Sequence, residues 1–95
     1  TITKADPAAY GNWSGSELWL GKNANTGFST TGLTVEVSED ATTFNALASS
    51  KYNTNDDGWV SISWDNIVEG LGDEPTGAFY VRITEGTTKY IFTNE

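Results

Sequence analysis

The tryptophans are the residues of this chain most able to bind a ligand, and the usual catalytic side chains His and Cys are missing. The 95 residues include four Trp but no His and no Cys. Catalytic triads and thiol nucleophiles are therefore excluded. Two carboxylates could still hydrolyse a glycosidic bond, but one of them needs a raised pKa in a dry cleft, and the sequence indicates no such cleft. We expect no catalytic residue and no enzyme activity.

Two tryptophans are predicted to lie on the outer faces of strands. Residues 16–21 read as a strand in which two leucines claim the core face, so Trp19 points the other way. In the strand predicted at 59–64, apolar residues alternate in the same manner. This alternation places Trp64 in the core and Trp59 on the opposite face.

Trp13 is predicted in a loop at 12–15, where its neighbours cannot cover it. A monomer gains little by exposing three indoles. Sugars offer a reason, because the apolar C–H face of a pyranose ring stacks on an indole while its hydroxyls need donors and acceptors nearby. By analogy with base stacking, each ring contributes roughly 1–3 kcal/mol. The alternative is that these indoles lie under loops, complete the core of a twisted sheet or lie against a neighbouring domain.

Polar side chains should surround such an aromatic platform. The candidates on its face, or in the loop leading to Trp59, are Asn12, Glu17, Tyr52, Asn55, Asp57, Tyr80 and Arg82. The alternative for each is an ordinary solvated surface residue.

The loop 53–58 begins with the oxygen-ligand spacing of an EF-hand. Position 12 of that motif falls on Trp64, where Glu is required, so an EF-hand is excluded. A looser structural calcium site at Asp56 or Asp57 is left as an alternative. We assign no metal ligand and no cofactor.

The elements that position these residues are short strands. Turn signals are frequent and no segment sustains a helical period, which is typical of a β-sandwich or barrel. Residues 33–38 alternate clearly, 40–50 is ambiguous between a helical turn and a strand, and 51–58 reads as a loop. A helical turn is predicted at 65–70, with a capping box formed by Asn66 and Glu69.

The strongest hairpin prediction joins residues 78–84 to 87–93 through a turn at Glu85-Gly86. Its register pairs Thr84 with Thr87, Arg82 with Lys89, Val81 with Tyr90, and Phe79 with Phe92. One face then collects apolar side chains for the core. The fold class predicted for residues 1–95 is a single all-β domain, a small antiparallel β-sandwich of immunoglobulin-like or jelly-roll type.

Charge and composition limit the partners. Thirteen acidic and five basic residues give a net charge of −8, which argues against nucleic acid, anionic membranes and acidic glycans. The chain opens on TITKADP without Met or a signal peptide, which indicates an excised module or a mature product. Its many Thr, Asn, Gly and Ser and its lack of Cys are typical of a secreted, extracellular bacterial module. We expect a monomer.

The segments NWSGSELWL (12–20) and GWVSISW (58–64) resemble carbohydrate-binding modules attached to cellulosomal glycoside hydrolases of rumen bacteria, in particular family 80. The resemblance covers nearly the whole chain. It implies an immunoglobulin-like sandwich with an aromatic platform at Trp13, Trp19 and Trp59. It also implies binding to internal stretches of β-mannan, glucomannan, xyloglucan and β-glucans.

The resulting hypothesis is a non-catalytic module that holds a linked glycoside hydrolase, in the same polypeptide, against β-linked plant cell-wall polysaccharide. The alternative is a structural immunoglobulin-like or protein–protein adhesion module of a bacterial surface or scaffold protein. In that case the tryptophans would pack on a neighbouring protein.

Overall fold

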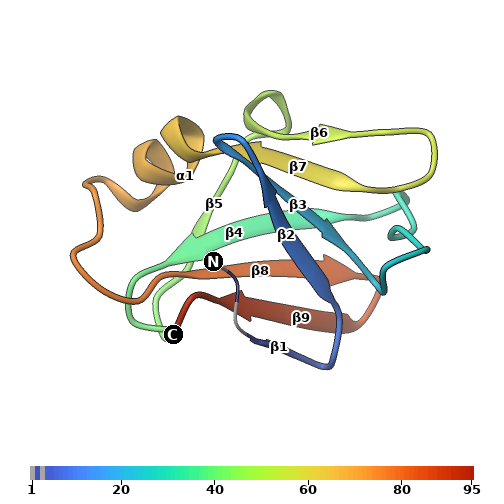
Figure 1. The fold of residues 1–95 in the computed structure, drawn as a ribbon, viewed down its shortest axis with the longest axis horizontal. Helices are drawn as coiled ribbons and strands as arrows, with labels where there is room; N and C mark the ends of the chain where they lie inside the picture. Colours follow the sequence, from blue (N-terminus) through green and yellow to red (C-terminus); the bar gives the residue numbers. More distant parts are fainter. Residues whose placement is uncertain (1, 3) are drawn as a thin grey trace.

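Two antiparallel sheets stack face to face in the computed structural model, which describes residue 2 and residues 4–95 (Figure 1). The five-stranded sheet has the order β1 (Lys4–Asp6), β9 (Thr88–Thr93), β8 (Tyr80–Glu85), β4 (Thr34–Ser38) and β5 (Asn45–Ala46). The four-stranded sheet has the order β2 (Tyr10–Ser14), β3 (Glu17–Gly21), β7 (Val60–Ser63) and β6 (Asn53–Thr54). Consecutive hairpins alternate between the two sheets. The predicted small all-β sandwich is confirmed.

The core lies between the sheets and follows the alternation of the strands. Leu18 and Leu20 of β3, and Val60 and Ile62 of β7, are fully buried, as are the inward residues of β4 and β8. Burying one such side chain stabilises the fold by roughly 1.5–3 kcal/mol. The inward faces predicted for these strands are confirmed.

The segment predicted as a loop at 12–15 belongs instead to a hairpin, so that prediction is wrong. Strand β2 pairs with β3 through a two-residue turn at Gly15 and Ser16, and Gly15 has a φ of 62°. A first turn residue with positive φ is what a type II′ turn requires, and Gly supplies it without strain. Trp13 pairs with the buried Leu18, so its indole faces inward.

The hairpin of β8 and β9 is confirmed, but its predicted register is wrong. The observed pairs include Val81 with Phe92, Arg82 with Ile91, Ile83 with Tyr90, and Thr84 with Lys89. The turn lies at Gly86 and Thr87, one residue later than predicted, because Gly86 takes the first turn position with a φ of 61°. A shift of the turn by one residue changes each partner by two positions, so the predicted inward and outward faces are kept.

The helix α1 (Trp64–Leu71) lies at one end of the sandwich (Figure 1). It is longer than the predicted turn at 65–70, and its cap is Ser63, whose hydroxyl accepts a hydrogen bond from the backbone N–H of Asn66. The predicted capping box is therefore wrong. The helix ends at Gly72 with a φ of 93°.

The ambiguous segment 40–50 contains the short strand β5, and the 3-10 turn η1 (Ser49–Lys51) begins at its end. The predicted loop 51–58 contains the two residues of β6. No helix in the described part of the chain is long and apolar enough to cross a membrane.

Candidate functional site

The outer face of the four-stranded sheet gathers two of the three predicted platform tryptophans. In its register, Asn12 of β2 lies opposite Trp19 of β3, and Trp19 lies opposite Ser61 of β7. Ser61 in turn lies opposite Asn53 of β6. A row across the sheet therefore carries one indole between hydrogen-bonding side chains. We call Tyr10, Asn12, Glu17, Trp19, Asn53 and Trp59 the tryptophan face.

Trp59 precedes β7 and lies over Gly21 at the end of β3. An added Cβ on Gly21 would lie 2.6 and 2.7 Å from two ring carbons of Trp59, so this position has no room for a side chain. Tyr10, which pairs with Gly21, contacts the same indole edge to face at 5.7 Å between ring centroids. This T-shaped contact is favourable and fixes the ring. The glycine thus lets the indole lie across the sheet.

Asn55 positions Trp59 through the intervening turn. Its Oδ1 accepts hydrogen bonds from the backbone N–H of Trp59 at 3.0 Å and of Asp57 at 2.9 Å. Its own N–H donates to the carbonyl of Trp59 at 3.0 Å. Asn55 was predicted to contact the ligand. Because its side-chain oxygen already accepts two backbone hydrogen bonds, it instead holds Trp59 in position. Asp57 lies exposed in the same turn.

The tryptophan face is less exposed than the sequence predicted. No large apolar side chain in the described part of the chain is fully exposed, and Trp19 and Trp59 are half-buried. Ser61, which pairs with Trp19 and follows Trp59 by two residues, is only 4% exposed. The prediction of exposed indoles is wrong because both rings are partly covered, and Tyr10 of β2 contacts the ring of Trp59. Their outward direction is confirmed.

Polar groups on the tryptophan face are free to bind. Asn12 and Asn53 are exposed, and no side-chain hydrogen bond occupies either amide within the described residues. Glu17 is half-buried and is the one charged residue of the face. The face therefore combines three aromatic rings, of which two are indoles, with two amides and one carboxylate. This set suits a neutral, hydroxyl-rich ligand better than an anion.

Trp13 is separated from Trp19 and Trp59, so the structure does not bring the three predicted platform residues together. Its ring contacts Trp64 at 5.9 Å and Phe79 at 6.5 Å between centroids, and Trp64 contacts Phe79 at 5.4 Å. The reason is the inward parity of Trp13 in β2. Trp64, predicted in the core, is half-buried and packs against it as the first residue of α1.

Three further predicted contacts lie away from the tryptophan face. Tyr80 and Arg82 belong to β8, on the outer face of the other sheet. Arg82 donates from Nε and Nη2 to the two carboxylate oxygens of Glu36 at 2.8 and 3.0 Å, and its guanidinium lies 4.0 Å from the ring centroid of Phe44. Tyr52 is half-buried and packs against the core. The grouping of Tyr80 and Arg82 with Trp19 is wrong because alternation does not tell which sheet a strand joins, and that of Tyr52 is wrong because its side chain packs against the core.

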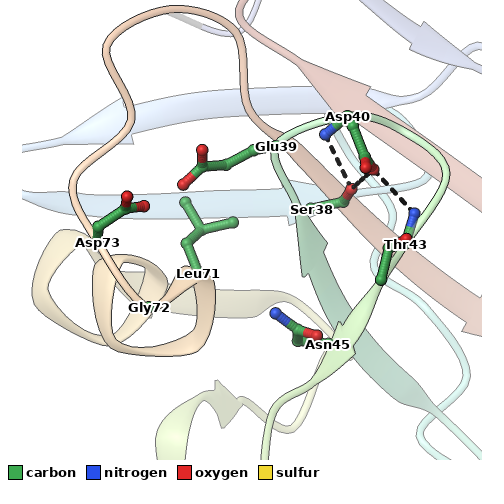
Figure 2. Close-up of a pocket in the computed structure, with 8 residues that line it drawn as sticks. All are labelled: Ser38, Glu39, Asp40, Thr43, Asn45, Leu71, Gly72 and Asp73. Carbon is green, nitrogen blue, oxygen red and sulfur yellow. Dashed lines mark hydrogen bonds between the residues drawn. The ribbon is translucent and has the colours of Figure 1, made fainter.

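An acidic hollow of about 450 Å³ lies between the β4–β5 connection and the end of α1 (Figure 2). Figure 2 shows the carboxylates of Glu39 and Asp73 turned toward each other. Asp73 raises the pKa of Glu39 through a hydrogen bond and like charge. The pKa of Asp40 is lowered, because its carboxylate accepts hydrogen bonds from the backbone N–H groups of Thr43 and Thr42 and from the hydroxyl of Ser38.

A metal site is not evident in the described part of the chain, where no group of three or more His, Cys, Asp or Glu side chains is placed to hold an ion. Asp56 and Asp57, the alternative calcium ligands, are both exposed.

Sequence reasoning missed Tyr10 and Asn53 as members of the tryptophan face. A signal for Tyr10 was present, since Gly15-Ser16 can form a two-residue turn that makes 10–14 a strand paired with 17–21. No comparable signal marks Asn53, because β6 has only two residues. In comparisons with known proteins, no family model, no curated protein and no solved structure matches this chain.

Proposed function

We propose that the chain is a non-catalytic module that binds neutral, β-linked polysaccharide on the tryptophan face. One observation carries the proposal: Trp19 and Trp59 share one outer face, and Gly21 leaves space for the second indole to lie across the sheet. Rings held in this way suit the apolar faces of successive sugar residues. Asn12 and Asn53 on the edge strands supply donors and acceptors for the hydroxyls.

The strength of binding follows from these contacts. Two stacking contacts contribute roughly 1–3 kcal/mol each, and the two amides add hydrogen bonds. Together they favour dissociation constants between millimolar and micromolar, which correspond to binding free energies of about −4 to −8 kcal/mol. Half-burial of both rings favours the weaker end of that range. Candidate ligands are glucomannan, β-mannan, xyloglucan and mixed β-glucans. The proposed setting is extracellular, with a linked glycoside hydrolase kept near its substrate.

Titration calorimetry with soluble glucomannan, galactomannan, xyloglucan and barley β-glucan tests the proposal, with starch and polygalacturonate as controls. Trp19→Ala and Trp59→Ala should each weaken binding about tenfold, which corresponds to about 1.4 kcal/mol. Tyr80→Ala is the matched control, because Tyr80 is a half-buried aromatic residue on the opposite outer face. It should leave binding unchanged.

Two results would contradict the proposal. Folded wild-type protein that binds none of these polysaccharides would favour the alternative function, a structural or adhesion module whose tryptophan face packs on a neighbouring protein. Equal losses in the Tyr80 and Trp19 variants would show that the effect is not specific to the tryptophan face.

A further inference from the structure

A second hollow, separate from the tryptophan face, lies at the end of the sandwich beside the β2–β3 turn. It has a volume of about 420 Å³ and is lined by Trp13, Gly15, Ser16, Trp64, Phe79 and Asn94, which we call the end hollow. Ligand pockets commonly have volumes of 300–1,000 Å³. The end hollow is thus large enough for one small ligand.

Three aromatic rings shape the end hollow. Their planes are inclined to one another by 69° for Trp13 and Trp64, 62° for Trp13 and Phe79, and 66° for Trp64 and Phe79. Rings packed edge to face cannot cover all of one another's faces. Trp13 and Trp64, which are half-buried, therefore form the aromatic walls of the hollow, whereas Phe79 is only 3% exposed and supports them.

The polar groups of the end hollow are all neutral. Asn94 is held in place because its Oδ1 accepts a hydrogen bond from the backbone N–H of Phe79 at 2.8 Å and its Nδ2 donates to the carbonyl of Gly77 at 3.4 Å, which leaves one N–H of the amide for a ligand. Ser16 is exposed at the rim, and its carbonyl accepts from the backbone N–H of Trp64 at 2.8 Å. Since none of the six lining side chains carries a charge, a charged ligand would lose hydration here without an ionic partner.

One donor in the wall has no partner. The Nε1–H of Trp13 is shielded from solvent and makes no hydrogen bond within the described structure. A buried donor without an acceptor is a cost to the folded state. A ligand hydroxyl that reached this N–H would give it an acceptor and would remove that cost.

We infer that the end hollow binds a single neutral pyranose ring, such as the end or a branch of a glycan chain. The aromatic walls match the apolar face of the sugar, and the amide, hydroxyl and unpaired indole N–H match its hydroxyl groups. Charged sugars are disfavoured because the lining is neutral. The inference does not depend on binding at the tryptophan face, and the two sites can be tested separately.

The test follows the four indole N–H signals of ¹⁵N-labelled protein by NMR, each assigned with a Trp→Phe variant. The probes are methyl β-D-glucopyranoside and methyl β-D-mannopyranoside, with glycerol and methyl β-D-glucuronide as controls. With at least one neutral glycoside, the Trp13 and Trp64 signals should shift in a saturable manner. Glycerol and the glucuronide should produce no saturable shift.

Ser16→Arg should block the end hollow and weaken this binding at least tenfold, because Ser16 lies at the rim and only its backbone is used in the fold. Thr87→Arg is the matched control, since Thr87 holds the same second position in the other two-residue turn that begins with Gly. Trp19→Ala should also leave the Trp13 shift unchanged.

The inference is overturned if the neutral glycosides fail to move the Trp13 signal, if glycerol moves it equally, or if Ser16→Arg and Thr87→Arg have equal effects. Loss of polysaccharide binding in the Trp19 and Trp59 variants, with a silent end hollow, would overturn this inference and leave the proposed function intact. A saturable Trp13 shift without any polysaccharide binding would support the end hollow alone.

Discussion

Replacement of Trp13 should reduce stability far more than replacement of Trp19, because the two indoles face opposite sides of the same sheet. Trp13→Ala removes a ring that contacts both Trp64 and Phe79 and leaves a cavity among them. Truncation of a buried Trp to Ala costs about 3–5 kcal/mol, and half-burial of Trp13 favours the lower value, about 3 kcal/mol. For a domain of this size, that loss lowers the Tm by about 12–24 °C.

Two further variants separate packing from hydrogen bonding. Trp13→Phe keeps an aromatic ring against both neighbours and removes the buried N–H, which has no acceptor among the described residues. The lost ring area and the removed unpaired donor act in opposite directions, so the free energy of unfolding should change by less than about 1 kcal/mol. Trp19→Ala removes an outward ring and should cost about 1 kcal/mol.

Urea unfolding followed by far-UV circular dichroism measures these differences, provided that the m-value stays constant across the variants. A Trp13→Ala variant no less stable than Trp19→Ala would refute the inward assignment of Trp13. A strongly destabilised Trp13→Phe variant would show instead that the indole N–H has a partner in solution.

Other positions give equally direct expectations. Gly21→Ala should destabilise the fold by about 1–3 kcal/mol, because its Cβ would meet the Trp59 ring and a backbone carbonyl at 2.8 Å; a neutral result in urea unfolding would contradict this placement of the ring. Ser63→Ala should cost about 1 kcal/mol through loss of the helix cap, and Ser63→Asp should retain most of the stability in the same assay. The pKa of Glu39 is raised by Asp73, so its favourable contribution to stability is complete below the ordinary pKa of 4.5 and is lost as pH rises through the raised pKa. Glu39→Gln should therefore be more stable than wild type in thermal melts at neutral pH, and this advantage should disappear below pH 4.5; an equal advantage at all pH values would contradict the coupling.

The direction of Trp19 and Trp59 could be predicted because alternation is a local property of a strand. Leu18 and Leu20 bracket Trp19 in sequence, and both are fully buried, so the indole between them must face outward. How much of each ring stays exposed could not be predicted in this way. Coverage depends on side chains from other strands, such as Tyr10 against Trp59.

The position of glycine in the two-residue turns explains two wrong predictions, the register of β8 and β9 and the loop at 12–15. Both two-residue turns begin with a Gly of positive φ, 62° at Gly15 and 61° at Gly86. Placing Gly second in the β8–β9 turn shifted the register but kept each face, since partners changed by two positions. Overlooking the turn at Gly15 had a larger effect, because it removed a whole strand and placed Trp13 in a loop.

The wrong placement of Arg82 beside Trp19 is explained by the sheet to which its strand belongs. Alternation places Arg82 on an outer face but does not say which one, because that depends on where each hairpin crosses between sheets. On the five-stranded sheet, Arg82 is engaged by Glu36 and Phe44. On the four-stranded sheet, the amides of Asn12 and Asn53 make no side-chain hydrogen bond to any residue that the structure describes, and they lie beside half-buried indoles. Polar groups already paired within the fold have little left to offer a ligand, so free amides beside aromatic rings indicate binding better than ring exposure alone.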